Sequence, residues 1–290
     1  MDRETFLQES IDYIKSEYKR VENIQNIINE IYDLFHSICK KHDIPYFLAF
    51  GSLIGQVRDG GIIPWDPDMD LCMHVSRISE LCEVLDKELP AEYFYESNFT
   101  SNEFPFFQMR IGKKGYPIKY VHLDIFYLIA CPDNMEISKF RKKVRNLYNI
   151  RLEWSKCQYK YNEVKAQSYF IYILKKFRYR IHSKFMSIKS INKKFIRLIT
   201  PGDYDTSPFL VTVSENALEF PRNDIEPMTY KIINGKEIGV PNNIENFLNR
   251  CYKNYREYLP IDARFHELYA WDSEYKIATG INQDYKYNRN

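Results

Sequence analysis

An apolar run, a glycine turn and two alternating carboxylates follow one another in the first quarter of the chain, and this order restricts the fold more than any other feature. The run YFLAF, residues 46–50, is typical of a short buried strand, and Gly51-Ser52 follows it directly. A second strand is expected over residues 69–75. Side chains alternate between the two faces of a strand, so Asp68 and Asp70 point the same way while Met69 and Leu71 enter the core.

The neighbouring segments predict a sheet with helices packed on it. Apolar residues recur every three or four positions from Ile24 to about Lys41, which indicates an amphipathic helix, and residues 78–89 form a second helical pattern. Other expected elements are strands at 93–96, 106–111 and 119–128, a hairpin turning at Asn234-Gly235 and a helix over 244–255. We therefore predict an α/β (α+β) fold, a small mixed twisted sheet flanked by helices.

The 290 residues, 44% of them hydrophobic, suffice to bury a substantial core. We expect a catalytic core over residues 1–135, a mostly helical basic region over 136–200 and a mixed section over 201–290 that completes the fold. The cysteines show no C-x-x-C pair, the beginning MDRETFLQES lacks an apolar leader, and no segment is long and apolar enough to span a membrane. These features favour a cytoplasmic location.

Three aspartates are candidates for a metal site. Asp68 and Asp70 share one face of their strand, and Asp124 lies among apolar residues on a strand that we expect to be a neighbour. Carboxylates held this close repel one another unless a cation or a proton lies between them, and oxygen ligands suit Mg²⁺ or Mn²⁺. Such sites serve phosphoryl transfer. For an isolated D-x-D pair a solvated strand edge is the commoner explanation, but the adjacent Gly51-Ser52 turn, whose amides and hydroxyl can meet a phosphate, favours a site.

The same residues resemble the LicD family. Gly51-Ser52, then Arg58, then IIPWDPDMDL and the downstream LDIF are similar to that family's glycine and hydroxyl residue followed by R-x-x-G-x-I-P-W-D-D-D-x-D. SICKKHDIPYFLAFGSLIG and GVPNNIENFLNRCY also resemble it, whereas residues 136–201 match nothing in it. Pro67 replaces a common acidic residue, and the family's late Tyr-Gly is here Tyr252-Lys253 or Tyr255-Arg256.

The resemblance implies a nucleotidyltransferase-like fold, related to that of the fukutin-type transferases, and a Mg²⁺-dependent activity. The reaction implied is transfer of a phosphorylated small group, typically phosphocholine from CDP-choline, to a cell-surface glycan such as lipopolysaccharide, teichoic acid or capsule, or to a lipid-linked precursor. Two alternatives remain open: transfer of the nucleotide itself, and a non-enzymatic membrane- or RNA-binding module. The sequence does not distinguish choline from ethanolamine, a phosphonate or a polyol phosphate.

Catalytic and metal-binding roles are predicted for Asp68, Asp70 and Asp124, the last also as an aid to deprotonating the acceptor. The predicted substrate-binding residues are Gly51, Ser52, Arg58, Trp65, Asp66 and Arg110. Arg58 could bind a donor phosphate or hold the aspartate loop, and both roles are favoured over a surface ion pair with Asp59 or Asp66. For Trp65, support of the loop is favoured over binding a quaternary ammonium. We expect Arg110 on a strand between the two aspartate strands, where it could reach a phosphate or form an edge ion pair, and His122 either beside Asp124 or in the core.

The region from Lys139 to Arg197 interleaves basic and aromatic residues, as in KFRKKVR, ILKKFRYRIH and INKKFIRLI. Charge runs are usually solvated helix faces, but the aromatic residues add two possible partners, an anionic membrane surface and RNA. We favour the membrane, at its inner face, with nucleic acid as the lesser alternative. The lysines expected to serve it are Lys142, Lys143, Lys175, Lys176, Lys193 and Lys194.

Overall fold

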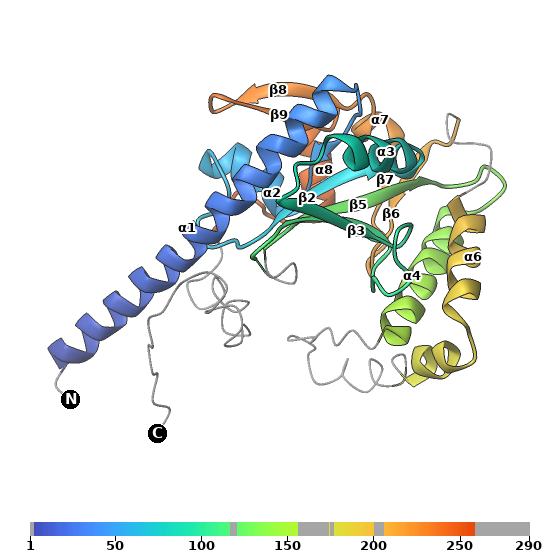
Figure 1. The fold of residues 1–290 in the computed structure, drawn as a ribbon, viewed down its shortest axis with the longest axis horizontal. Coiled ribbons are helices and arrows are strands. Elements are labelled where there is room, and N and C mark those ends of the chain that lie inside the picture. Colours follow the sequence, from blue (N-terminus) through green and yellow to red (C-terminus); the bar gives the residue numbers. More distant parts are fainter. Residues whose placement is uncertain (1–2, 117–120, 156–173, 175–176, 200–205, 259–290) are drawn as a thin grey trace.

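The computed structural model describes residues 3–116, 121–155, 174, 177–199 and 206–258 (Figure 1). A mixed sheet flanked by helices forms its centre, which confirms the predicted fold class. Within the described residues the strands follow the order β1-β2-β5-β4-β3, while β6 pairs with β5 beyond the end of β4 and β7 pairs with β6. Their bounds are β1 Phe47–Leu48, β2 Met69–His74, β3 Tyr93–Ser97, β4 Gln108–Lys113, β5 Leu123–Ala130, β6 Phe209–Thr212 and β7 Glu219–Pro221.

The pair β2 and β5 is parallel and carries the predicted aspartates, whereas the other described strand pairs of this sheet are antiparallel. Asp70 and Asp124 are direct partners in the parallel register. The expected adjacency of the two aspartate strands is therefore confirmed. It also fixes the faces of the sheet, because residues in register on neighbouring strands point to the same side.

Helix α1, Arg3–Lys41, is longer than the helix expected from Ile24, and its N-terminal part extends beyond the sheet (Figure 1). The buried positions Ile24, Ile28, Ile31 and Phe35 follow the helical period and anchor its second half in the core. No glycine or proline interrupts residues 3–41, so the helix continues beyond its apolar stripe. Helix α3, Ile78–Glu88, packs against α1.

The strand expected over residues 46–50 is shorter than predicted. β1 covers Phe47–Leu48, and Phe50 has a left-handed φ of 48° and begins the short helix α2, Phe50–Ile54. Because a left-handed residue cannot continue a strand, the chain turns one residue before Gly51. A π-helical turn, Gly55–Asp59, follows α2 and leads into the loop that ends at β2.

The last described section completes the fold around the carboxylate face of the sheet. Strands β8, Thr229–Ile233, and β9, Lys236–Val240, form the predicted hairpin, with positive φ at Asn234 and Gly235. Helix α7, Arg222–Ile225, follows β7, and helix α8, Ile244–Cys251, follows β9. Helix α8 ends before residue 255, where the sequence predicted its end. Phe247 of α8 stacks on Phe220 and contacts Phe50, whose ring meets Phe126 of β5.

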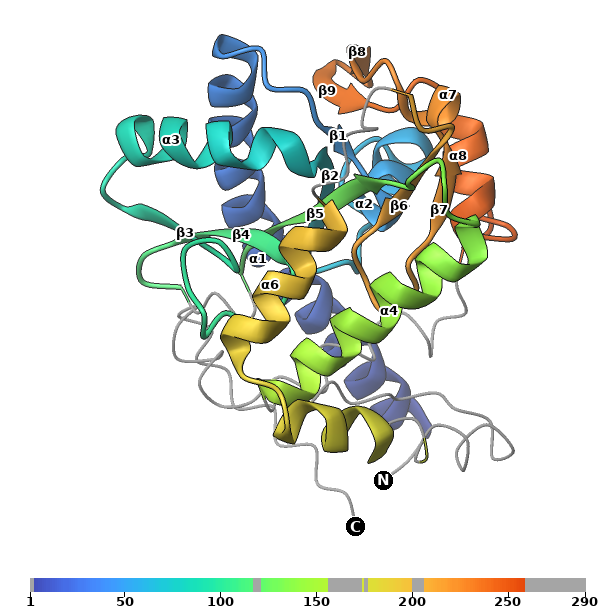
Figure 2. The ribbon, with the colours of Figure 1, turned by 90° about the vertical axis from the view of Figure 1, so that its right-hand side faces the viewer.

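The basic region forms a helical layer on the opposite face of the sheet (Figure 2). It contains α4, Ile137–Trp154, α6, Ile188–Ile199, and helical residues 177–184 between them. Phe195 of α6 stacks on Phe107 with ring centroids 4.1 Å apart and lies beside Tyr127, so α6 is anchored to the face that Asp124 does not share. None of the helices among the described residues is both long enough and apolar enough to cross a membrane.

Candidate active site

The turn between β1 and α2 is bonded directly to the beginning of β2. The backbone N–H of Asp70 donates to Ser52 Oγ at 2.7 Å, and the N–H of Ala49 donates to the carbonyl of Asp70 at 2.9 Å. Ser52 is buried. Because a hydroxyl can accept one hydrogen bond and donate another, Ser52 can hold β2 in register and still donate its proton to a ligand oxygen.

Close packing explains two of the glycines in this segment. A Cβ on Gly51 would lie 2.8 Å from Asp66 Oδ2, so the absence of a side chain lets the Asp66 carboxylate approach the turn. A Cβ on Gly55 would lie 2.4 Å from the carbonyl oxygen of Gly61, which is backbone and cannot rotate away. The loop after α2 therefore folds tightly against the turn and brings the acidic residues back to it.

The predicted carboxylates lie along one end of the parallel pair. Asp70 and Asp124 are partners across β2 and β5, so their side chains leave the same face from strands about 4.8 Å apart. Asp68 immediately precedes β2, and the carbonyl and N–H of Asp66 are fixed by bonds to Gln25 Nε2 and to the carbonyl of Ile63. We call Asp66, Asp68 and Asp70 the acidic group.

Asp124 is buried in a network of donors. Gln108 Nε2 and Arg110 Nε each donate to Asp124 Oδ1 at 2.7 Å, and His122 Nε2 lies 3.3 Å from Oδ2. Burial alone would raise the pKa of this carboxyl, but the charges and hydrogen bonds of Arg110 and His122 outweigh it and hold the pKa well below its usual range. Asp124 is therefore ionised at neutral pH and is a weak base.

The predicted position of Arg110 is wrong. Arg110 is on β4, which pairs with β5 on the side away from β2, so it is not between the aspartate strands. It is the direct cross-strand partner of Asp124 and covers the ring of Phe106 with its guanidinium 4.6 Å from the centroid. On the β4 side of β5, Arg110 neutralises the charge of Asp124. On the β2 side, Asp124 is the register partner of Asp70.

Arg58 and Trp65 join the loop to the segment after α8. The Arg58 guanidinium donates to the Asp59 carboxylate, with Nη2 to Oδ2 at 2.8 Å, and its Nη1 donates to the carbonyls of Tyr255 and Glu257. It also lies over the ring of Tyr258, which makes an edge contact with Trp65. These contacts match the loop-supporting interpretations of both residues, while their binding to substrate stays a prediction.

Two residues without a predicted role lie at the site, and of these the sequence named only Tyr252, as a possible match to the family's late tyrosine. Gln108 shares the Asp124-facing side of β4 with Arg110, a relation that the spacing of two along a strand could have indicated. Tyr252 caps α8 and is 37% exposed. Partial burial is the largest cause that raises its pKa, and the negative charges of Asp70, Asp66 and Asp68 raise it further. The Tyr252 phenol therefore lies within the field of the acidic group and stays protonated.

The donor set at this end of the sheet has the chemistry of a divalent-cation site, because hard carboxylate oxygens gather around the Ser52 turn. Asp68 and Asp70 are the residues that would hold such an ion. Asp124 already carries Arg110 as its counter-charge. Over the described ranges, no group of three or more His, Cys, Asp or Glu side chains is arranged as a metal site, so the three-aspartate cradle stays a prediction.

Comparison with known proteins agrees with the sequence motifs. Residues 43–159 match the family model described as the LicD/FKTN/FKRP nucleotidyltransferase domain, and this span contains β1 to β5 with every predicted site residue. The chain is also similar to the lipopolysaccharide cholinephosphotransferase LicD of Haemophilus influenzae. The two are 26% identical over 250 residues, which cover 81% of this chain and 91% of that protein.

Proposed function

Because the chain belongs to the LicD family through its nucleotidyltransferase domain, we propose that it is a transferase that moves phosphocholine from CDP-choline to a glycan such as lipopolysaccharide or its lipid-linked precursor. The observation that carries this proposal is the register pair Asp70 and Asp124, which lies beside the Ser52 turn on one face of the sheet. A similar protein of nearly equal extent is a cholinephosphotransferase.

In the proposed reaction, an acceptor hydroxyl oxygen attacks the phosphorus that bears choline. The bond from that phosphorus to the bridging oxygen breaks, CMP leaves with the electron pair, and the acceptor proton passes to a base or to water. Attack at the other phosphorus would transfer CMP instead, which is the nucleotidyl-transfer alternative. The family match covers a domain type rather than a choice of phosphorus, so the donor needs direct testing.

The residues of the site have different roles in the proposed reaction. Ser52 and the N–H groups of the turn at Gly51 hold phosphate oxygens of the donor, as hydroxyls and free amides at a turn can. Asp68 and Asp70 would hold a Mg²⁺ ion, which would offset the charge that develops on the phosphates. The Arg110–Asp124 pair holds β4 to β5 beside Asp70. Because the pKa of Asp124 is lowered, this carboxylate keeps its negative charge and is a poor proton acceptor.

Tyr252 provides a neutral donor at the same place. Its raised pKa keeps the phenol protonated at neutral pH, so its O–H can donate to a phosphate oxygen or to the acidic group. A neutral donor beside several carboxylates orients an anionic substrate and leaves the charge of the carboxylates available to the cation. Tyr252 thus extends the predicted site to the end of α8.

The experiment is a donor panel. The protein is incubated with Mg²⁺, a lipopolysaccharide acceptor and CDP-choline, CDP-ethanolamine or CTP, and the release of CMP and pyrophosphate is followed. We expect CMP release from CDP-choline that depends on both acceptor and Mg²⁺. Asp70→Asn should abolish it, and Glu92→Gln, which alters an exposed carboxylate on the loop before β3, should not. Pyrophosphate release from CTP, without reaction of any CDP donor, would favour nucleotidyl transfer.

A further inference from the structure

The helical residues 177–184 turn their apolar side away from the protein. On the inner side, Tyr179 donates through its hydroxyl to Asn146 Oδ1 of α4 at 3.0 Å, and Ser183 is buried. On the outer side, large apolar side chains recur at helical spacing and are exposed. They are Leu174, Phe177, Ile181 and Phe185, with Phe177 62% and Phe185 86% exposed. We call these four residues the apolar stripe.

This orientation is the reverse of the usual one, in which a surface helix buries its apolar side against the core. Exposing two phenylalanines this far is unfavourable in water, because their apolar surface does not gain the free energy that burial would provide. Contiguous exposed apolar side chains of this kind mark a contact with a partner or a membrane.

The charge around the stripe favours one kind of partner. Between Val164 and Gly202 the sequence contains no Asp or Glu, and basic residues interleave with the stripe, including Arg178, Arg180 and Lys184. An amphipathic helix with large apolar residues on one side and cations beside them is typical of a segment that lies in the interface of an anionic bilayer. A protein partner would also need acidic residues to match this surface, whereas a bilayer provides both the anionic and the apolar layer.

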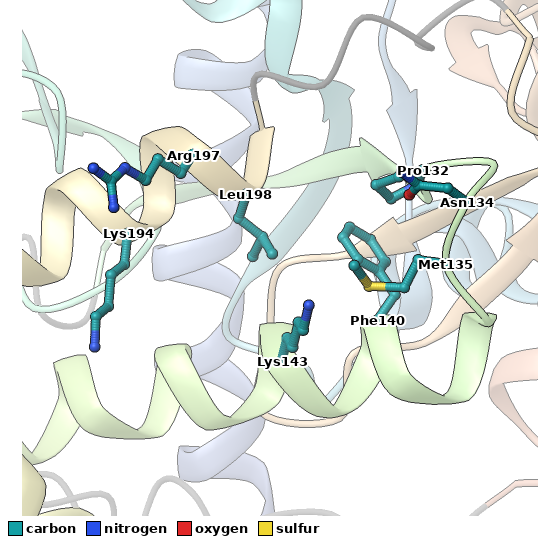
Figure 3. Close-up of a pocket in the computed structure, with 8 residues that line it drawn as sticks. All are labelled: Pro132, Asn134, Met135, Phe140, Lys143, Lys194, Arg197 and Leu198. Carbon is teal, nitrogen blue, oxygen red and sulfur yellow. The ribbon is translucent and has the colours of Figure 1, made fainter.

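A cationic pocket between α4 and α6 adds a place for a headgroup (Figure 3). It has a volume of about 390 Å³, with an apolar floor that includes Phe140 and Leu198. Lys143 rises into it from α4, and α6 contributes Lys194 and Arg197. In the part of the chain that the structure describes, no carboxylate lies within ion-pair distance of these three cations.

The pocket and the stripe belong to one surface. Lys194 Nζ lies 3.7 Å from the sulfur of Met186, the residue that follows Phe185. The two acidic residues just before α4 are engaged elsewhere: Asp133 accepts from Thr206, and Glu136 accepts from Ser138 and pairs with Lys139. Figure 3 shows Lys143 directed toward Leu198 and Phe140, whereas Lys194 and Arg197 extend from α6 away from Lys143. The three cations are therefore spread over the surface beside an apolar pocket, which suits the phosphates of an anionic layer.

We propose that this surface binds an anionic phospholipid bilayer, with the apolar stripe inserted at the headgroup boundary and Lys143, Lys194 and Arg197 in contact with lipid phosphates. The surface lies behind the sheet, because α6 packs on the face opposite to Asp124. Of the lysines predicted for membrane contact, Lys143 and Lys194 line the pocket, Lys142 and Lys193 lie on the same helices outside it, and Lys175 and Lys176 lie outside the described residues. The proposal does not depend on the reaction proposed above.

The test is sedimentation of the full chain with vesicles of phosphatidylcholine, with or without phosphatidylglycerol. We expect binding to the anionic vesicles that weakens as salt is raised. The triple variant Lys143→Gln, Lys194→Gln and Arg197→Gln should bind roughly a hundredfold more weakly, because each cation near the surface contributes on the order of fivefold. The pair Phe177→Ser and Phe185→Ser should lose about tenfold even at low salt, because its contribution is apolar.

Two control variants separate specific contacts from general effects. The triple Lys87→Gln, Lys114→Gln and Lys231→Gln removes the same charge from exposed positions elsewhere, and Ile232→Ser removes an equally exposed apolar residue from the β8–β9 hairpin. Both should bind like the unmodified chain, and circular dichroism confirms that each variant is folded. Equal losses in test and control triples would overturn the pocket assignment. Absence of anionic-vesicle binding at low salt, or binding of single-stranded RNA instead, would overturn the proposal.

Discussion

Replacing Asp124 by Asn should destabilise the fold by about 3 kcal/mol at pH 7. Asp124 Oδ1 accepts from Arg110 Nε at 2.7 Å, and both side chains are nearly buried, with 11% and 13% of their area exposed. Removing one member of a buried ion pair costs about 3–5 kcal/mol, because the other charge is left without compensation. We place Asp124→Asn near the lower end of this range, because both side chains are slightly exposed and the asparagine amide oxygen can still accept from Gln108.

The pH dependence identifies the cause. The pKa of Asp124 is lowered in the folded protein, so its charge contributes stability that is fully present above the unfolded carboxyl pKa of about 3.9 and is lost as the pH falls through the folded value. The difference between the two proteins should therefore be constant from pH 5 to 8 and should shrink below about pH 4.

The assay is urea denaturation followed by circular dichroism, with Glu83→Gln as a matched control at an exposed carboxylate of α3. The control should stay within about 0.5 kcal/mol of the unmodified protein. Arg110→Met combined with Asp124→Asn should cost less than the sum of the two single changes, because the pair is then removed together. A cost for Asp124→Asn below 1 kcal/mol, or one that does not change on acidification, would refute the ion-pair explanation.

Three further changes test the site. Asp70→Asn should lower turnover by about a thousandfold or more, because a metal supplies several kcal/mol of transition-state stabilisation. The melting temperature of the metal-free variant should stay the same or rise, because one of the repelling carboxylates is removed. Near-normal turnover with Mg²⁺ would contradict the metal assignment. Gly55→Ala should cost several kcal/mol in chemical denaturation, since the new Cβ meets the Gly61 carbonyl; an unchanged midpoint would show that the loop can move. Tyr252→Phe should keep the melting temperature but lower kcat/KM about tenfold, and unaltered kinetics would remove the phenol from the site.

Local patterns predicted the part of the site that lies on two strands. The alternating pattern placed Asp70 on a strand, and the apolar neighbours of Asp124 placed it on a buried strand, which the structure pairs with β2. Asp68 lies one residue before β2, so its common face with Asp70 stays a prediction. The hairpin at Asn234-Gly235 followed from turn chemistry alone. Each of these predictions depends on residues close together in the sequence.

The remainder depends on long-range packing. No local pattern shows that β4 borders β5 on its far edge, so Arg110 was placed between the wrong strands. Tyr252 lies far along the chain from the acidic group and reaches it only because α8 covers the Asp124 face of the sheet through Phe247. The role of Arg58 as a link to Tyr255 likewise depends on where that late segment returns.

The most direct test of the account uses CDP-choline labelled with ³²P at the phosphorus that bears choline. The labelled donor is incubated with the protein, Mg²⁺ and lipopolysaccharide, and the glycan is separated from the nucleotide products. The account predicts that the label enters the glycan in equal amount to the CMP released, and that Asp70→Asn prevents both. Label that stays on a soluble choline product while CMP becomes attached to the acceptor would contradict it, because the enzyme would then attack the other phosphorus.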